Sequence, residues 1–144
     1  MTEANKPNTA FWIVGVIALI WNGMGVMSYL GSVYMTEEIR AAYTAEQLAV
    51  MDSAPAWLTG VYALAVFLGL LGALLLLLKR KLAVPVFGIS LLMVLVQMIY
   101  SWVATDSIAA FGTVQGIVMP LLVIVIAIFL YYYSKGAAGK GWLK

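Results

Sequence analysis

The sequence predicts an all-α membrane protein: a four-transmembrane-helix bundle with a short amphipathic helical segment between the first and second helices. Residues 57–78 and 82–103 contain no charged side chain and are separated only by the basic turn Lys79-Arg80-Lys81. Either stretch can cross a hydrocarbon core of about 30 Å, which takes roughly 20 helical residues. The chain is 65% hydrophobic and only 10% charged, whereas soluble domains carry about 25% charged residues. We therefore expect a single integral membrane domain, residues 1–144.

The first span is expected at residues 11–30, after a short polar tail. A cleaved signal peptide is the competing interpretation, but the tail is not clearly basic and no Ala-x-Ala site follows the apolar run. A retained span is therefore preferred. Within it, Trp21 and Asn22 precede two closely spaced glycines. An amide in the hydrocarbon interior needs partners, so Asn22 is expected to join helices, with contact to a ligand as the alternative.

Residues 36–52 form the only sizeable polar segment. Thr36 precedes two glutamates, which is typical of a helix N-terminus. Thr44 and Gln47 have the spacing of a capping box. We expect one or two short amphipathic helices that lie on the membrane surface or across the mouth of the bundle. A solvated connector and a functional lid both remain open as roles.

The three further spans and the tail are expected at residues 56–78, 82–103, 111–133 and 134–144. In the second span Ala65, Gly69 and Ala73 recur every four residues, a pattern that marks close helix contact. Such glycine and alanine stripes are also expected to support self-association. Pro120 lies inside the fourth span, where it should kink the helix and free a backbone carbonyl.

The charges alternate across the spans. The first loop is acidic apart from Arg40, the second is the basic turn, the third contains only Asp106, and the tail contains three lysines at 135, 140 and 144. The positive-inside rule then places both termini and the basic turn in the cytoplasm, with the amphipathic segment outside. We expect a multi-pass protein with cytoplasmic N- and C-termini.

Polar side chains recur at a similar depth in the spans. At about 1.5 Å per residue, Tyr62, Gln97 and Gln115 lie roughly 24–27 Å from the cytoplasmic edge, and Asn22 lies below them. An outward-facing pocket lined by amides and phenols would suit a neutral or amphipathic molecule, for instance a sugar, a lipid headgroup or a quinone ring. The alternative is that these groups pair with one another and only fix helix packing. The candidate ligand-binding residues are Asn22, Tyr62, Gln97 and Gln115 as hydrogen-bonding groups, with Trp21 and Trp57 as a stacking surface.

Several functions are disfavoured by what the sequence lacks. It contains no cysteine and no histidine, which excludes disulfides, thiol redox centres, histidine-ligated haem and the usual structural zinc sites. No ionisable residue lies inside a span, so a proton relay is not expected. The acidic residues all lie in loops or tails, so we expect no catalytic residue, no metal site, no cofactor and no enzyme. The net charge of +2 is not spread over a basic surface, so no nucleic-acid partner is expected.

Four short stretches resemble a known group of proteins: Trp21-Asn22-Gly23-Met24-Gly25, Pro55-Ala56-Trp57, Gln97-Met98 and the closing Lys140-Gly141-Trp142-Leu143-Lys144. Together they resemble small four-span bacterial membrane proteins often labelled "sugar transporter", and the general plan resembles the DoxX-like four-helix membrane proteins. The resemblance covers nearly the whole chain. Its motifs are structural, so it transfers no defined site.

This resemblance implies a protein of the bacterial cytoplasmic membrane and favours binding of a solute. Transport by so small a chain would require an oligomer, because alternating access normally uses repeated bundles. The leading hypothesis is binding, extended to transport in an oligomer, of a small neutral or amphipathic molecule. The alternative is an accessory or structural subunit of a larger membrane complex. Membrane lipids, and either further copies of the chain or other subunits, are the expected partners.

Overall fold

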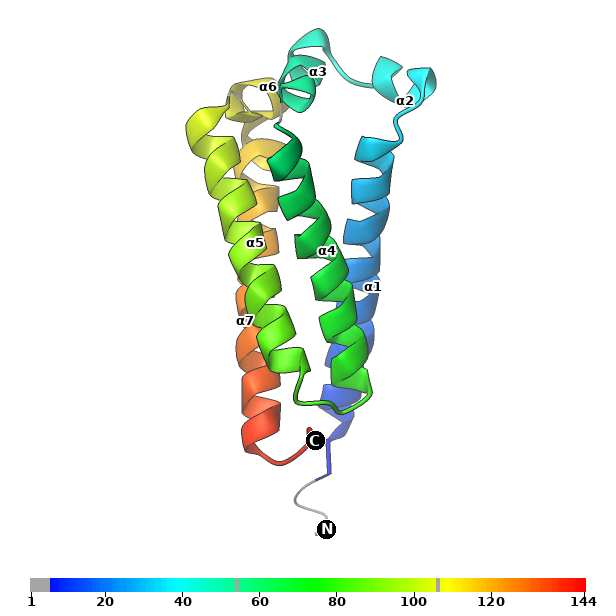
Figure 1. Cartoon of the computed structure of the whole chain (residues 1–144), viewed down its shortest axis with the longest axis vertical. Helices are drawn as coiled ribbons and strands as arrows, with labels where there is room; N and C mark the ends of the chain where they lie inside the picture. Colours follow the sequence, from blue (N-terminus) through cyan, green and yellow to red (C-terminus); the bar gives the residue numbers. More distant parts are fainter. Residues whose placement is uncertain (1–5, 54, 106) are drawn as a thin grey trace.

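The computed structural model describes residues 6–53, 55–105 and 107–144 and contains helices but no strands over these residues (Figure 1). Four helices are long and apolar enough to cross a membrane. Three of them are α1 (Thr9–Val33), α4 (Ala56–Leu77) and α5 (Ala83–Ala104). The fourth span, Gly116–Gly139, consists mainly of α7 (Met119–Gly139). The predicted all-α bundle of a multi-pass membrane protein is confirmed, and its exposed apolar helices are suited to contact with membrane lipids.

The first and last long helices extend beyond the predicted spans. α1 begins at Thr9, where the Asn8 side chain accepts a hydrogen bond from the N–H of Phe11 at 2.9 Å, and it continues to Val33 rather than ending at residue 30. α7 continues to Gly139, beyond the expected end at residue 133. Hydropathy marks where the chain leaves the apolar region, whereas backbone hydrogen bonding continues into the polar residues that follow.

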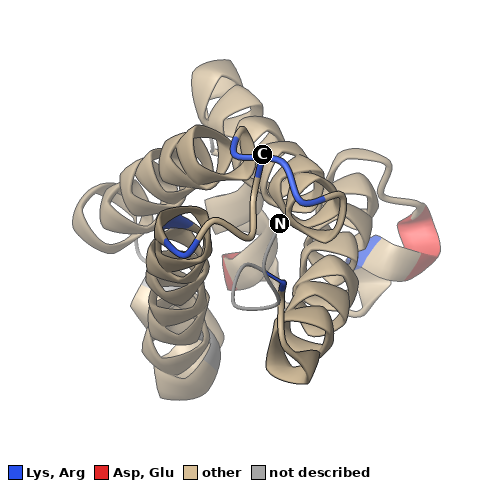
Figure 2. Ribbon diagram, turned by 90° about the horizontal axis from the view of Figure 1, so that it is seen from below, with Lys and Arg blue, Asp and Glu red and all other residues tan. Residues whose placement is uncertain are grey.

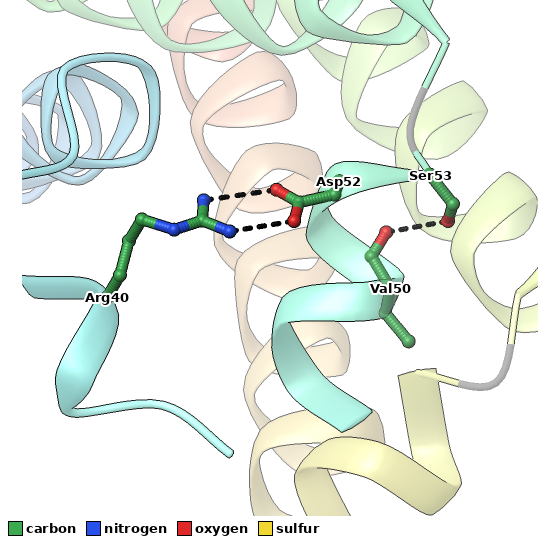
Figure 3. Close-up of polar contacts among 4 residues, drawn as sticks. All are labelled: Arg40, Val50, Asp52 and Ser53. Atoms are coloured by element: carbon green, nitrogen blue, oxygen red, sulfur yellow. Dashed lines mark hydrogen bonds and ion pairs between the residues drawn. The ribbon is translucent and has the colours of Figure 1, made fainter. Parts of the chain in front are cut away.

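Two short helices connect α1 to α4: α2 (Glu37–Ala41) and α3 (Ala45–Asp52). The expected capping box is present, since the Thr44 N–H donates to Gln47 Oε1 and the Gln47 N–H donates to Thr44 Oγ1, both at 3.1 Å. The two helices are joined by an ion pair, in which Arg40 donates two hydrogen bonds to the Asp52 carboxylate at 3.1 and 2.8 Å (Figure 3). These hydrogen bonds hold the pKa of Asp52 below its usual value and raise the pKa of Arg40.

The fourth span begins irregularly. α6 (Ser107–Thr113) contains Gly112 with a φ of 83°, and a π-helical turn at Val114–Val118 leads into α7. Pro120 has no N–H, so the carbonyl of Gly116 lacks its usual helical donor. The indole N–H of Trp102 donates to that carbonyl at 2.6 Å. The helix irregularity expected at Pro120 is thus a π turn that lies just before the proline. The Gly116 carbonyl accepts a hydrogen bond from a side chain of α5. Asp106, expected to mark this connection, lies outside the described residues.

The long helices pack mainly in chain order, α1 on α4, α4 on α5 and α5 on α7, and no comparably extensive contact between α1 and α7 occurs in the described chain. These two outer helices approach at the end that holds the chain termini. There Phe11 of α1 stacks on Tyr133 of α7, with ring centroids 6.5 Å apart, and Trp142 meets Phe11 edge-on at 5.8 Å. Phe11 and Leu76, which are fully buried, belong to one core cluster with Trp142 and Leu143 near the C-terminus.

The small-residue stripe of α4 lies inside this packing. Ala65 and Ala73 are 4% and 0% exposed, and Gly69 is also buried. The stripe therefore makes contacts within the chain. Because it is buried, it is not free to join copies of the chain, although the sequence analysis expected such stripes to support self-association.

Candidate functional site

A partly open cavity of about 400 Å³ lies among α1, α4, α5 and α7. All four long helices contribute to its wall. Ligand sites for small molecules range over about 300–1,000 Å³, so this cavity is large enough for a compact ligand or for part of an elongated one. No aspartate, glutamate, lysine or arginine is among its described lining residues.

The first polar contact at the cavity joins α1 to α4. The hydroxyl of Tyr62 donates to Ser28 Oγ at 3.0 Å, and Tyr29 meets the Tyr62 ring edge-on with centroids 5.4 Å apart. Both partners of the hydrogen bond line the cavity. Tyr62 is thus positioned by its neighbours, while its hydroxyl oxygen can still accept a hydrogen bond from a ligand.

Asn22 lies where three helices meet. Its Nδ2 donates to the carbonyl of Ala18 at 2.8 Å, which is one turn earlier on α1. Its Oδ1 lies directly against Gly69 of α4, at a point that a Cβ would occupy, and Ser90 of α5 reaches the same point, 3.3 Å from that Cβ position. Ser90 donates to the carbonyl of Ala65 at 2.7 Å. Gly69 therefore makes room for two polar side chains, and Asn22 Oδ1 has no hydrogen bond within the described chain.

Gln97 lies about two turns beyond Ser90 along α5 and lines the same cavity. Its side chain is half-buried, and it forms no hydrogen bond with any described residue. The amide offers two donors and one acceptor toward the cavity. In the interior of a membrane bundle an unpaired amide is unfavourable, because lipid cannot replace the missing hydrogen bonds.

The remaining wall is apolar. α7 contributes only apolar residues, from Met119 to Leu130, while Trp21, Met24 and Met98 come from α1 and α5. Methionine side chains adapt their shape to irregular apolar contents. The cavity thus has amide and hydroxyl groups on α1, α4 and α5 and an apolar face on α7.

Four of the six candidate residues are brought together: Trp21, Asn22, Tyr62 and Gln97 all line the cavity. Trp57 does not. It lies in the first turn of α4 and is 54% exposed. Its ring packs edge-on against Tyr100, with ring centroids 5.2 Å apart. The side chain of Gln115 lies outside the described part of the structure.

Segment 36–52, considered as a lid, contributes no residue to the cavity wall. Instead α3 packs on α6, where Gln47 donates to the carbonyl of Ala110 at 3.2 Å. Sequence reasoning did not identify Ser28 or the methionines as lining residues. Their positions depend on helix rotation, which no local signal in the sequence specifies.

Among the described residues, no group of three acidic side chains is close enough to hold a metal ion. Comparison of the chain with protein-family models, with curated proteins and with solved structures finds no match.

Proposed function

We propose that the chain binds a small, neutral, amphipathic molecule in the cavity among its four long helices. The observation that carries this proposal is the Gln97 amide, which faces the cavity with no partner in the described chain. A hydroxyl or carbonyl of a ligand would supply the missing hydrogen bonds. Asn22 Oδ1 and the Tyr62 hydroxyl would then be additional polar contacts, and Trp21 an apolar surface.

The division of the wall favours an amphipathic ligand over a free sugar. A sugar could hydrogen-bond to the amides but would leave the apolar face of α7 uncovered. A molecule with a polar head and an apolar body, such as a lipid-like or quinone-like compound, would cover both faces. The absence of charged groups from the described lining also favours a neutral head.

We place this protein in the bacterial cytoplasmic membrane, with the termini and the basic turn in the cytoplasm and α2 and α3 outside. The ligand would enter from the bilayer, because α1 and α7 lack extensive mutual packing alongside the cavity. Transport, as distinct from binding, would require an oligomer. We propose no catalytic step, since the lining offers hydrogen-bonding groups but no acid–base pair.

A second candidate function is that of a structural subunit in a larger membrane complex. It is favoured by the hydrogen bonds that Tyr62, Ser90 and Asn22 already make inside the bundle. Polar groups satisfied in this way would fix helix packing without any ligand. On this hypothesis Gln97 would pair with a residue of another chain.

Native mass spectrometry on protein extracted gently from its own membrane separates the two candidates. Ligand binding predicts a small molecule retained at fixed stoichiometry in the wild type. Gln97→Met should weaken retention by up to about tenfold, because one hydrogen bond contributes about 0.5–1.5 kcal/mol, while the thermal unfolding temperature stays at or above that of the wild type.

Tyr100→Phe is the matched control. It removes a polar group from the same helix at a position that does not line the cavity, so it should retain the small molecule. A wild type that carries other proteins but no small molecule would instead support the structural subunit.

A further inference from the structure

The C-terminal residues fold back onto the bundle. At the end of α7, Gly141 has a φ of 80°. The N–H of Trp142 bonds to the carbonyl of Ala137 at 3.0 Å, and that of Gly141 to the carbonyl of Ala138 at 3.1 Å. This pair of bonds is a Schellman motif, which reverses the chain. As a result Trp142 and Leu143 are buried, with exposed fractions of 9% and 2%.

The reversal brings Lys144 to the turn between α4 and α5. Its N–H donates to the carbonyl of Lys79 at 2.7 Å, and its main-chain oxygen accepts from the N–H of Lys81 at 2.9 Å. We call Lys79, Arg80, Lys81 and Lys144 the basic cluster. Figure 2 looks onto this end of the bundle, where lysine and arginine positions surround the C-terminus.

No described aspartate or glutamate accompanies the basic cluster. The described acidic residues all belong to α2 and α3, at the opposite end of the bundle (Figure 1). Main-chain hydrogen bonds thus bring the backbones of these four basic residues together, with no described carboxylate side chain beside them. Like charges at short range repel one another, and a bound anion removes that repulsion.

Lys79 itself is unusual. Among the described residues it is the single non-glycine with a positive φ, 58°. It occupies the reversing position of a second Schellman motif, in which its N–H bonds to the carbonyl of Leu76 at 3.0 Å and that of Arg80 to the carbonyl of Leu75 at 2.9 Å. Glycine is the residue favoured at this position, because it has no Cβ. Lys79 therefore holds a backbone conformation that glycine would adopt without strain.

We propose that the basic cluster binds the phosphate-bearing headgroup of an anionic phospholipid. The cluster lies where two apolar spans, α4 and α5, end, so it reaches the headgroup layer when these helices cross a bilayer. Lipid phosphates are the abundant anions at that depth, and basic pockets at helix ends bind them. The ammonium of Lys140, 4.7 Å from the centroid of the Trp142 ring, adds a cation on the same folded-back tail. This site is independent of the cavity.

Thermal unfolding of the full chain in a neutral detergent tests the proposal. The probes are phosphatidylglycerol, phosphatidylcholine with the same acyl chains, and inorganic phosphate. Phosphatidylglycerol should raise the unfolding temperature of the wild type by several degrees, and the other two should not. High salt should reduce the shift, since exposed charges are screened.

The informative variant is Lys79→Gly. It removes a charge but relieves the positive φ, so its unfolding temperature without lipid should equal or exceed that of the wild type. Its shift with phosphatidylglycerol should nevertheless fall by half or more. These opposite responses separate loss of headgroup binding from a folding defect.

Lys144→Gln should lose the phosphatidylglycerol shift in the same way. Lys6→Gln is the matched control, because it removes the same charge outside the basic cluster, and it should keep the full shift. Equal shifts with both lipids, a shift with inorganic phosphate alone, or a full phosphatidylglycerol shift in Lys79→Gly would each overturn the proposal.

Discussion

Replacing Gly69 with alanine should destabilise the bundle, although alanine is the better helix former. A Cβ at this position would overlap the side-chain oxygen of Asn22 and would lie 3.1 Å from Asn22 Cγ and 3.3 Å from Ser90 Oγ. Overpacking of this kind costs about 1–3 kcal/mol. The gain in helix propensity is about 1 kcal/mol, which leaves a net loss of up to about 2 kcal/mol in the free energy of unfolding.

Gly60→Ala supplies the matched control. Gly60 is in the same helix, and a Cβ there would meet nothing within 4 Å. The propensity gain is common to both variants, so the difference between their free energies of unfolding isolates the steric cost, about 1–3 kcal/mol. Reversible unfolding in mixed micelles, with a rising fraction of sodium dodecyl sulfate, provides the measurement.

A double variant tests the cause. If the Asn22 oxygen is the obstacle, Asn22→Ala should make Gly69→Ala tolerable, and the two substitutions should couple by more than about 0.5 kcal/mol. Equal stability of Gly69→Ala and Gly60→Ala would refute the close contact at Gly69. Additive effects in the double variant would refute the role assigned to Asn22.

Three further outcomes are expected. The ion pair between Arg40 and Asp52 should be complete above the ordinary aspartate pKa of 3.8, and it should be lost as the pH falls through the lowered pKa of Asp52. The carboxyl chemical shift of Asp52 would report this titration, and a midpoint at or above 3.8 would contradict the prediction. Thr44→Ala should destabilise α3 by about 1 kcal/mol through loss of its cap, which faster amide hydrogen exchange in α3 alone would reveal. Trp102→Phe should leave the carbonyl of Gly116 without its indole donor and lower the free energy of unfolding by about 1–3 kcal/mol. An unchanged free energy of unfolding would show that another group replaces the indole.

The features that could be predicted from the sequence are those set by neighbouring residues. The spans follow from long apolar runs, and the Thr44–Gln47 capping box follows from a three-residue spacing that fixes its own geometry. The stripe around Gly69 marked a close contact correctly. The contacting residues, Asn22 and Ser90, could not be named because they depend on the relative rotation and height of three helices.

The same limit explains the outcome for the site. Tyr62 and Gln97 were selected by depth alone, and both line the cavity. Trp57 was included as part of a stacking surface, but position along the helix does not specify the face of α4 from which a side chain projects. The fold-back at Trp142 was likewise not predicted, because its reversal depends on Gly141, and the sequence has two other glycines near the C-terminus, at 136 and 139.

The position of the cavity follows from where the outer helices are joined. At the end that holds the termini, the contacts of Phe11 with Tyr133 and Trp142 link α1 to α7 and to the folded-back tail. At the other end, α7 leads through the π turn into α6, which packs on α3. Between these ends, α1 and α7 are not drawn together by an extensive contact of their own. Side chains of α4 and α5, including Gln97, therefore border the cavity there. The lack of such a contact leaves the Gln97 amide unpaired in the described chain, and it also leaves room for a ligand that can form the missing hydrogen bonds.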